Sequence, residues 1–173
     1  MDHCALLTDA AIRPRYAAEQ VLADISEATL HARPDGRGSS IAWLVWHAAR
    51  QQDVQVADLR GADEVWVSGD WADRLGVPRG PEDFGFGDGP AEVASLRIAD
   101  PAELLAYLTA VVAATVDHVA RLSPGNLDDV VDTNWTPHVT RGVRLVSVID
   151  DMVAHLGQAA YVRGLVDGWS IGY

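Results

Sequence analysis

Apolar positions recur at helical spacing in four long segments of this chain. They fall three and four residues apart through residues 6–25, 41–59, 101–122 and 144–166, which is the periodicity of a helix with one buried face. The remaining sequence contains no convincing series of alternating apolar and polar positions. The pattern therefore predicts an all-α protein, and four amphipathic helices of this length are typical of a four-helix bundle.

Several residues at the ends of these segments are typical of helix termini. Ser39 or Ser40 offers an N-cap for the second helix. Asp100 followed by Pro101 is a strong start for the third helix, because proline suits the first helical position. Gly61 supplies a C-terminal stop for the second helix. These signals support the boundaries that the periodicity predicts.

The connection between the second and third helices, residues 62–100, lacks helical periodicity and is rich in glycine and proline. Connections of this length are usually functional or carry small helices of their own, and residues 70–75 could form one. Four aromatic residues lie in it: Trp66, Trp71, Phe84 and Phe86. We therefore expect a long, partly structured connection that packs back on the bundle, and its length allows a crossover.

Composition and charge narrow the class of protein. The 173 residues suit one domain, residues 1–173, and the 49% hydrophobic and 22% charged content is that of a globular chain. The formal net charge of −12 disfavours nucleic acid as a partner, because a binder of polyphosphate usually presents a basic patch. No apolar run reaches the length of about 20 residues that a bilayer requires, so no membrane association is expected.

The single cysteine and the start of the chain bear on location. Cys4 excludes an intramolecular disulfide and a zinc site of several cysteines. We expect it to lie in a loose N-terminus. The first residues lack a basic region followed by an apolar stretch and a cleavage site, so we predict no signal peptide. The expected compartment is the cytoplasm.

Candidate chemistry gathers on the second and fourth helices. Asp151 and His155 are four residues apart, so both project from one face of a helix. They lie on or beside an apolar stripe, where a carboxylate is costly to bury unless it is paired or ligates a metal. His47 lies in the middle of the second predicted helix. Taken alone, the Asp151–His155 pair can also be a simple surface contact without metal.

In its layout the sequence resembles the DinB-like superfamily of bundle metalloproteins, which includes the N-terminal domain of mycothiol-dependent maleylpyruvate isomerase and the bacillithiol S-transferases. The resemblance covers nearly the whole chain and is carried best by SIAWLVWHAARQQD in the second helix and RLVSVIDDMVAHLGQAAYVRGL in the fourth. It implies a metal site with the ligands His47, Asp151 and His155. At position 151 many members have histidine and the isomerase domain has glutamate, so aspartate is a departure.

The resemblance also implies a cofactor, and helical spacing places several polar residues near the predicted ligands. The ligand set suits zinc, nickel, iron or manganese, of which zinc and nickel are favoured. Gln158 could orient a ligand or a bound water, and Gln51 could line a pocket mouth. Arg163 could bind a substrate carboxylate, although an arginine there also suits the C-terminal dipole of its helix. The co-substrate would be a small thiol such as mycothiol, together with an electrophile.

Other polar residues receive structural interpretations. Asp53 lies well off the face of His47, which favours a surface role or an ion pair with an arginine. His138, in the connection before the fourth helix, could approach the site as any loop residue could. An apolar pocket wall could be formed by Trp43, Trp46, Trp66, Trp71 and Trp135, but ordinary packing is favoured for at least three of the five.

Two functions remain open. The first is a metal-dependent thiol transferase or isomerase. The second is a non-enzymatic, stress-related metal-binding or dimerising protein in which the metal is structural or absent. The chain has no room for the second domain of the isomerase, which weakens a transfer of that particular activity. Members of the superfamily often form dimers, so a homodimer is an expectation from the resemblance alone.

Overall fold

The computed structural model describes residues 2–172 of the chain, and most of them are helical. In chain order the elements are α1 (His3–Leu22), α2 (Glu27–Leu30), the 3₁₀ turn η1 (Pro34–Gly36), α3 (Ile41–Arg60), α4 (Val65–Ser68), α5 (Trp71–Leu75), α6 (Pro90–Ser95), α7 (Pro101–Val119), the 3₁₀ turn η2 (Pro124–Asp128), β1 (Val130–Asp132), β2 (Val139–Thr140) and α8 (Arg141–Asp167).

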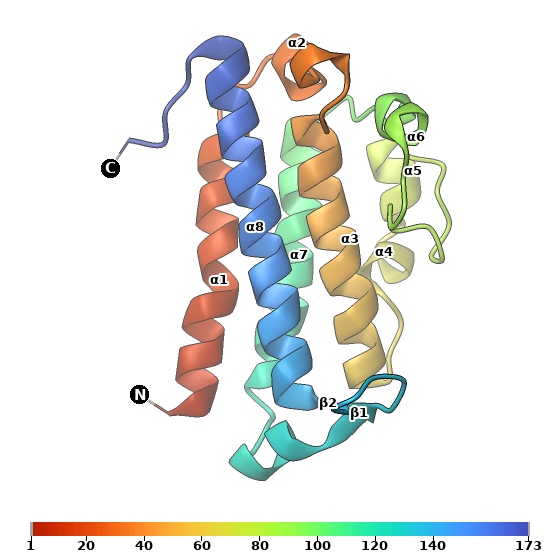
Figure 1. The fold of residues 1–173 in the computed structure, drawn as a ribbon, viewed down its shortest axis with the longest axis vertical. Helices are drawn as coiled ribbons and strands as arrows, with labels where there is room; N and C mark the ends of the chain where they lie inside the picture. The colour runs from red at the N-terminus through yellow and green to blue at the C-terminus, as the bar shows by residue number, and fades with distance from the viewer. Residues whose placement is uncertain (1, 173) are drawn as a thin grey trace.

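The four long helices α1, α3, α7 and α8 form a bundle (Figure 1). Helices α1 and α3 each pack against both α7 and α8, so α1 and α3 lie on one diagonal of the bundle. Helices α1 and α8 run in one direction, whereas α3 and α7 run in the other. The chain must therefore return along the whole bundle between α3 and α7. The predicted all-α four-helix bundle is confirmed, and the long connection is a crossover.

Capping side chains explain where the helices begin. The Ser40 hydroxyl accepts a hydrogen bond from the backbone N–H of Trp43, and the Asp100 carboxylate accepts one from Ala102. At the other end of α3, Gly61 adopts the left-handed conformation with φ of 61° that a helix C-terminus favours. The second and third helices therefore begin where the sequence predicts.

Two helices begin earlier than the apolar periodicity predicts. Asp2 caps α1 by accepting a hydrogen bond from the N–H of Ala5, and Thr140 caps α8 by accepting one from Val143. A cap acts through its own side chain and does not require an apolar residue in the first turn. Cys4 consequently lies inside α1, contrary to the expectation of a loose N-terminus.

The crossover segment packs along the outer side of α3, with α4, α5 and α6 as short helical pieces (Figure 1). Trp66 and Trp71 are buried, as the prediction that this segment returns to the bundle requires. The predicted helical piece at residues 70–75 is α5. Trp66 of α4 and Trp71 of α5 both meet Tyr107 of α7, whose ring centroid lies 5.2 Å from that of Trp66 and 5.3 Å from that of Trp71.

A buried polar network fastens this crossover to α3. The Asp53 carboxylate accepts hydrogen bonds from the backbone N–H groups of Val65 and Trp66, at 2.8 and 2.7 Å, and from the Tyr107 hydroxyl at 2.9 Å. Arg50 lies 3.6 Å from the same carboxylate. The expected surface position of Asp53 is therefore wrong, while the expected ion pair with an arginine is confirmed. A buried carboxylate is tolerable here because each of its oxygens has a partner.

The connection before α8 contains a small antiparallel ladder that the sequence did not indicate. Strands β1 and β2 pair Val130 with Thr140 and Asp132 with Val139, with an irregular register between them. Such short strands lack a measurable alternation of apolar and polar positions, so periodicity does not detect them. The ladder closes the end of the bundle at which α8 begins (Figure 1).

Helix α7 differs from the expectation that no apolar segment reaches the length of a membrane span. Among residues 2–172 it is the one helix long and apolar enough to span a membrane by length and composition alone, with a mean hydropathy of 1.4. Its buried side chains, including Leu104 and Leu108, belong to the core of the bundle. The core helix of a water-soluble bundle meets the same two criteria.

Candidate metal centre

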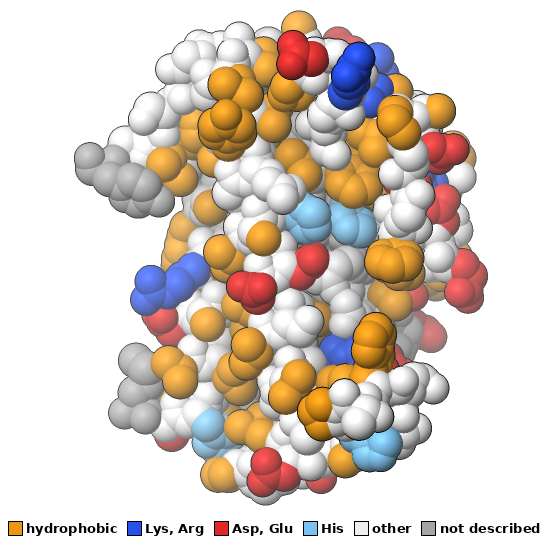
Figure 2. All heavy atoms as spheres, in the orientation of Figure 1, with side chains coloured by type: hydrophobic (Ala, Val, Ile, Leu, Met, Phe, Trp, Pro, Cys, Tyr) orange, Lys and Arg blue, Asp and Glu red, His pale blue; other side chains and the backbone are white. Residues whose placement is uncertain are grey.

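The side chains of His47, Asp151 and His155 come together between α3 and α8. One potential ligand atom of each lies within 4.8 Å of the others. His47 comes from the middle of α3, and the other two are one turn apart on α8. Figure 2 shows histidine side chains gathered on the face of the molecule over these helices, with acidic side chains beside them. The group can hold a metal ion.

The ring of His47 is held from two sides. Its Nδ1 atom lies 2.6 Å from the backbone carbonyl oxygen of Phe84, and because a carbonyl can only accept, this nitrogen carries the proton. The indole of Trp43 stacks on the imidazole with ring centroids 4.5 Å apart and 15° between the planes. The neutral ring therefore presents an unprotonated Nε2, which is the form that binds a metal.

The two residues of α8 also have oriented partners. The Nδ1 atom of His155 lies 3.0 Å from the amide oxygen of Gln158, which leaves Nε2 of His155 facing Oδ2 of Asp151 at 3.7 Å. The amide nitrogen of Gln51 donates a hydrogen bond of 2.7 Å to Oδ2 of Asp151. The two imidazoles thus each keep a ring nitrogen for a metal ion, and the Asp151 carboxylate is held in place beside them.

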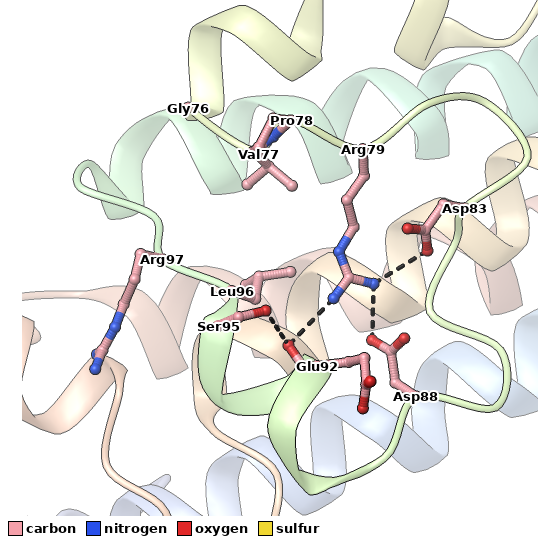
Figure 3. A pocket seen from close by; sticks show the side chains of 10 residues that line it. All are labelled: Gly76, Val77, Pro78, Arg79, Asp83, Asp88, Glu92, Ser95, Leu96 and Arg97. Atoms are coloured by element: carbon pink, nitrogen blue, oxygen red, sulfur yellow. Dashed lines mark hydrogen bonds and ion pairs between the residues drawn. The ribbon is translucent and has the colours of Figure 1, made fainter.

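The crossover segment supports the His47 side of the group. The Asp88 carboxylate accepts hydrogen bonds of 2.8 Å from both the Trp43 indole N–H and the Arg79 guanidinium. Arg79 also contacts Asp83. The close-up shows the side chains of Arg79, Asp83 and Asp88 converging at one end of a cavity of about 410 Å³ (Figure 3). The position of Trp43, and through it that of His47, therefore depends on residues far away in the sequence.

Burial sets the protonation of His47. Desolvation lowers the pKa of His47 below its ordinary value of 6.5, and the nearby His155 ring lowers it further. The hydrogen bond to the Phe84 carbonyl and the charges of Asp151 and Asp88 act in the opposite direction but do not reverse the shift. The ring is consequently neutral at pH 7, so no proton competes with a metal ion at its free nitrogen.

The stability of the metal-free protein is expected to fall as the pH decreases below about 7. Burial lowers the pKa of both His47 and His118 below 6.5. The unfolded chain therefore takes up protons on these rings first, so the free energy of unfolding decreases from about pH 6.5 downward until the folded protein also binds them. Urea unfolding across this range measures the effect. The variant His118→Gln should show a shallower pH dependence; an unchanged slope would contradict the assignment.

The loop over His47 leaves no room for a side chain at Gly85. A Cβ atom there would lie 2.9 Å from Nδ1 of His47 and 2.9 Å from the Trp46 ring, and φ is 89°. We expect Gly85→Ala to destabilise the protein by more than the roughly 1–2 kcal/mol of backbone strain that any such φ costs, and to weaken metal binding. Gly87→Ala is the matched control, with φ of 84° and open space around its Cβ. Thermal denaturation measures the loss of stability, and metal titration measures the loss of affinity. Equal losses in Gly85→Ala and Gly87→Ala would refute the steric role.

The structure places Arg163 away from the metal group. Its guanidinium Nη1 donates to the backbone carbonyls of Gln20, Val21 and Ala23, at 3.2, 2.7 and 2.9 Å, at the C-terminal end of α1. These carbonyls have no partner within their own helix, so the arginine satisfies them. The predicted role in binding a substrate carboxylate is therefore corrected to a structural one.

Other candidate residues also lie apart. His138 is exposed, with Nδ1 3.0 Å from the carbonyl of Trp135. A second group of potential ligands, Asp2, His3 and Cys4, lies at the start of α1. There Cys4 donates to the Val119 carbonyl at 3.2 Å, so its thiol packs against the end of α7. Sequence reasoning missed the Phe84 carbonyl and the Asp88 carboxylate, for which no spacing signal exists.

The fold and the grouped side chains define a class of protein, the all-α bundles with a candidate metal site between two long helices. The sequence model of the DinB superfamily matches residues 11–159. The chain therefore belongs to the DinB superfamily, as its resemblance predicted.

Among solved structures, the chain is similar to the crystal structure of a conserved protein from Enterococcus faecalis. The two are 38% identical, with a TM-score of 0.90 over 98% of this chain and 99% of that chain. No functionally curated protein matches the chain significantly. The relatives thus support the family and the fold, and the chemistry has to be argued from the side chains.

Proposed function

We propose that this protein is a divalent-metal-dependent thiol transferase or isomerase that acts with a low-molecular-weight thiol such as mycothiol. The observation that carries the proposal is the open side of the His47–Asp151–His155 group, in which the side chain of Asp151 is 38% exposed and that of His155 is 18% exposed. Two imidazoles and one carboxylate suit zinc or nickel and leave at least one coordination position free. A structural ion is normally enclosed by a full set of protein ligands.

A metal ion held there lowers the pKa of a coordinated thiol and so supplies a thiolate near neutral pH. The chain's own contribution is to hold the donor atoms in place. Gln158 and the Phe84 carbonyl fix the two imidazoles, and Trp43 shields one face of His47 from water. In the transfer, the thiol sulfur forms a bond to an electrophilic carbon, the leaving group departs with its electron pair, and the thiol proton passes to solvent.

The test combines metal analysis with a conjugation assay. Protein purified from its own host is expected to hold about one divalent ion per chain, because the group offers a single set of three ligands. With mycothiol and monochlorobimane it should form the fluorescent conjugate and release chloride. Removal of the metal by a chelator should abolish the reaction, and adding zinc or nickel should restore it.

Failure of the assay has a definite meaning. Metal-loaded protein that is inactive with mycothiol, bacillithiol and glutathione, across several electrophiles, would contradict the proposed activity and favour the non-enzymatic alternative. The proposal also implies a cytoplasmic protein, because small thiols are kept reduced there.

A further inference from the structure

A continuous chain of side-chain hydrogen bonds leads from the β-ladder to the carboxylate of the metal group. Asp132 of β1 accepts a hydrogen bond of 2.9 Å from Arg144, and Arg144 donates another of 2.9 Å to the amide oxygen of Gln55. The amide nitrogen of Gln55 donates to the amide oxygen of Gln51. Gln51 in turn donates to Asp151 at 2.7 Å.

The donor-to-acceptor direction of this series of hydrogen bonds is imposed by the residues at its two ends. A guanidinium has only donors, so Arg144 must face the oxygen of the Gln55 amide. That leaves the NH₂ group of Gln55 to face the oxygen of Gln51, and the NH₂ group of Gln51 to face Asp151. An ionised carboxylate has only acceptors, so the last bond fits the same order. An amide alone could rotate by half a turn, but here each amide has one orientation that satisfies both neighbours.

The side chains in this series of hydrogen bonds are partly shielded from solvent. Gln51 is buried, and the side chains of Arg144 and Asp132 are 21% and 18% exposed. The N–H of Asn134 and the contact with Arg144 lower the pKa of Asp132, which keeps that carboxylate charged and Arg144 fixed at neutral pH. Hydrogen bonds in such surroundings are stronger than in water, and successive links polarise one another.

We propose that Arg144 and Gln55 are positioning residues of the metal centre. They fix the Gln51 amide so that it donates to Oδ2 of Asp151, the oxygen that lies 3.7 Å from Nε2 of His155, and so hold this carboxylate against the other ligands of the group. The inference rests on the proposed metal site but not on the transferase reaction.

The variant Gln55→Glu gives the sharpest test, because it preserves size and the contact with Arg144. The new carboxylate cannot donate to Gln51, so the Gln51 amide must rotate and present its oxygen to Asp151. We expect Co²⁺ to bind about 10-fold more weakly, as for other outer partners of metal ligands, with a changed visible absorption spectrum. The added negative charge alone would strengthen binding, so electrostatics and positioning predict opposite signs.

Two further variants separate positioning from general damage. Arg144→Met should weaken Co²⁺ binding and alter the spectrum in the same way. Arg141→Met is the matched control, because Arg141 lies in the same first turn of α8 but contacts the Leu59 carbonyl and Asp129. It should leave both readouts unchanged.

The outcomes are distinguishable from those of the proposed function. Wild-type affinity and spectrum in Gln55→Glu and Arg144→Met would overturn the positioning role alone, and so would an equal loss in Arg141→Met. Wild-type protein that fails to bind Co²⁺, Zn²⁺ or Ni²⁺ would overturn both proposals. Metal binding with the expected variant effects but no conjugation would overturn only the transferase.

Discussion

Replacing Arg50 with methionine is expected to reduce the free energy of unfolding by about 3–5 kcal/mol, the usual cost of breaking a buried ion pair. The Arg50 side chain is fully buried and lies beside the Asp53 carboxylate, which is 3% exposed. It also donates to Glu64 at 2.8 Å and to the Pro81 carbonyl at 2.7 Å. Methionine preserves much of the volume but leaves Asp53 charged and buried without its cation.

Urea unfolding measures this loss, and the crossover should become accessible to protease before the bundle unfolds. Arg74→Met is the matched control, because Arg74 also pairs with an acid and stacks on a tryptophan, but its side chain is 43% exposed. An exposed pair contributes about 0–1 kcal/mol. Equal losses in the two variants would show that burial of the pair does not determine its contribution.

The second large effect is a loss of metal affinity in the variant His47→Ala. Loss of one of three ligands should weaken Zn²⁺ or Ni²⁺ binding by more than the roughly 10–100-fold that the loss of an outer partner costs. Isothermal titration of metal-free protein provides the measurement. Because His47 also packs against Trp43, circular dichroism must confirm that the variant is folded.

His155→Ala provides an independent check, since its side chain is less buried and its removal disturbs less packing. His138→Ala is the control, because that side chain lies in the exposed hairpin before α8. Unchanged metal binding in His47→Ala would remove His47 from the site.

The bundle could be predicted because its determinants are local. Helical periodicity defines the buried faces, and residues such as Ser40 and Asp100 mark where helices begin. The β-ladder was missed because its strands are too short to show a period. Asp53 was misplaced because its partners, the N–H groups of Val65 and Trp66, belong to a segment without periodicity.

The metal group was only partly visible in the sequence. The spacing of Asp151 and His155 is a signal in one helix, whereas the approach of His47 depended on the family resemblance. The contact between Gln55 and Gln51 is indicated by their spacing, since the two residues lie four apart on the same face of α3. The contacts of Arg163 could not be predicted, because the carbonyls at the end of α1, which it satisfies, have no counterpart in the local sequence.

The hydrogen bond between His47 and the Phe84 carbonyl has a consequence for how this centre can evolve. A backbone acceptor is present whatever side chain occupies the position, so substitutions at residue 84 leave the His47 tautomer intact as long as the loop keeps its course. Gln158 and Gln51 have no such freedom, because their side chains supply the contacts. Relatives should therefore carry many different residues at position 84 and few besides glycine at position 85, where a positive φ and close contacts restrict the residue.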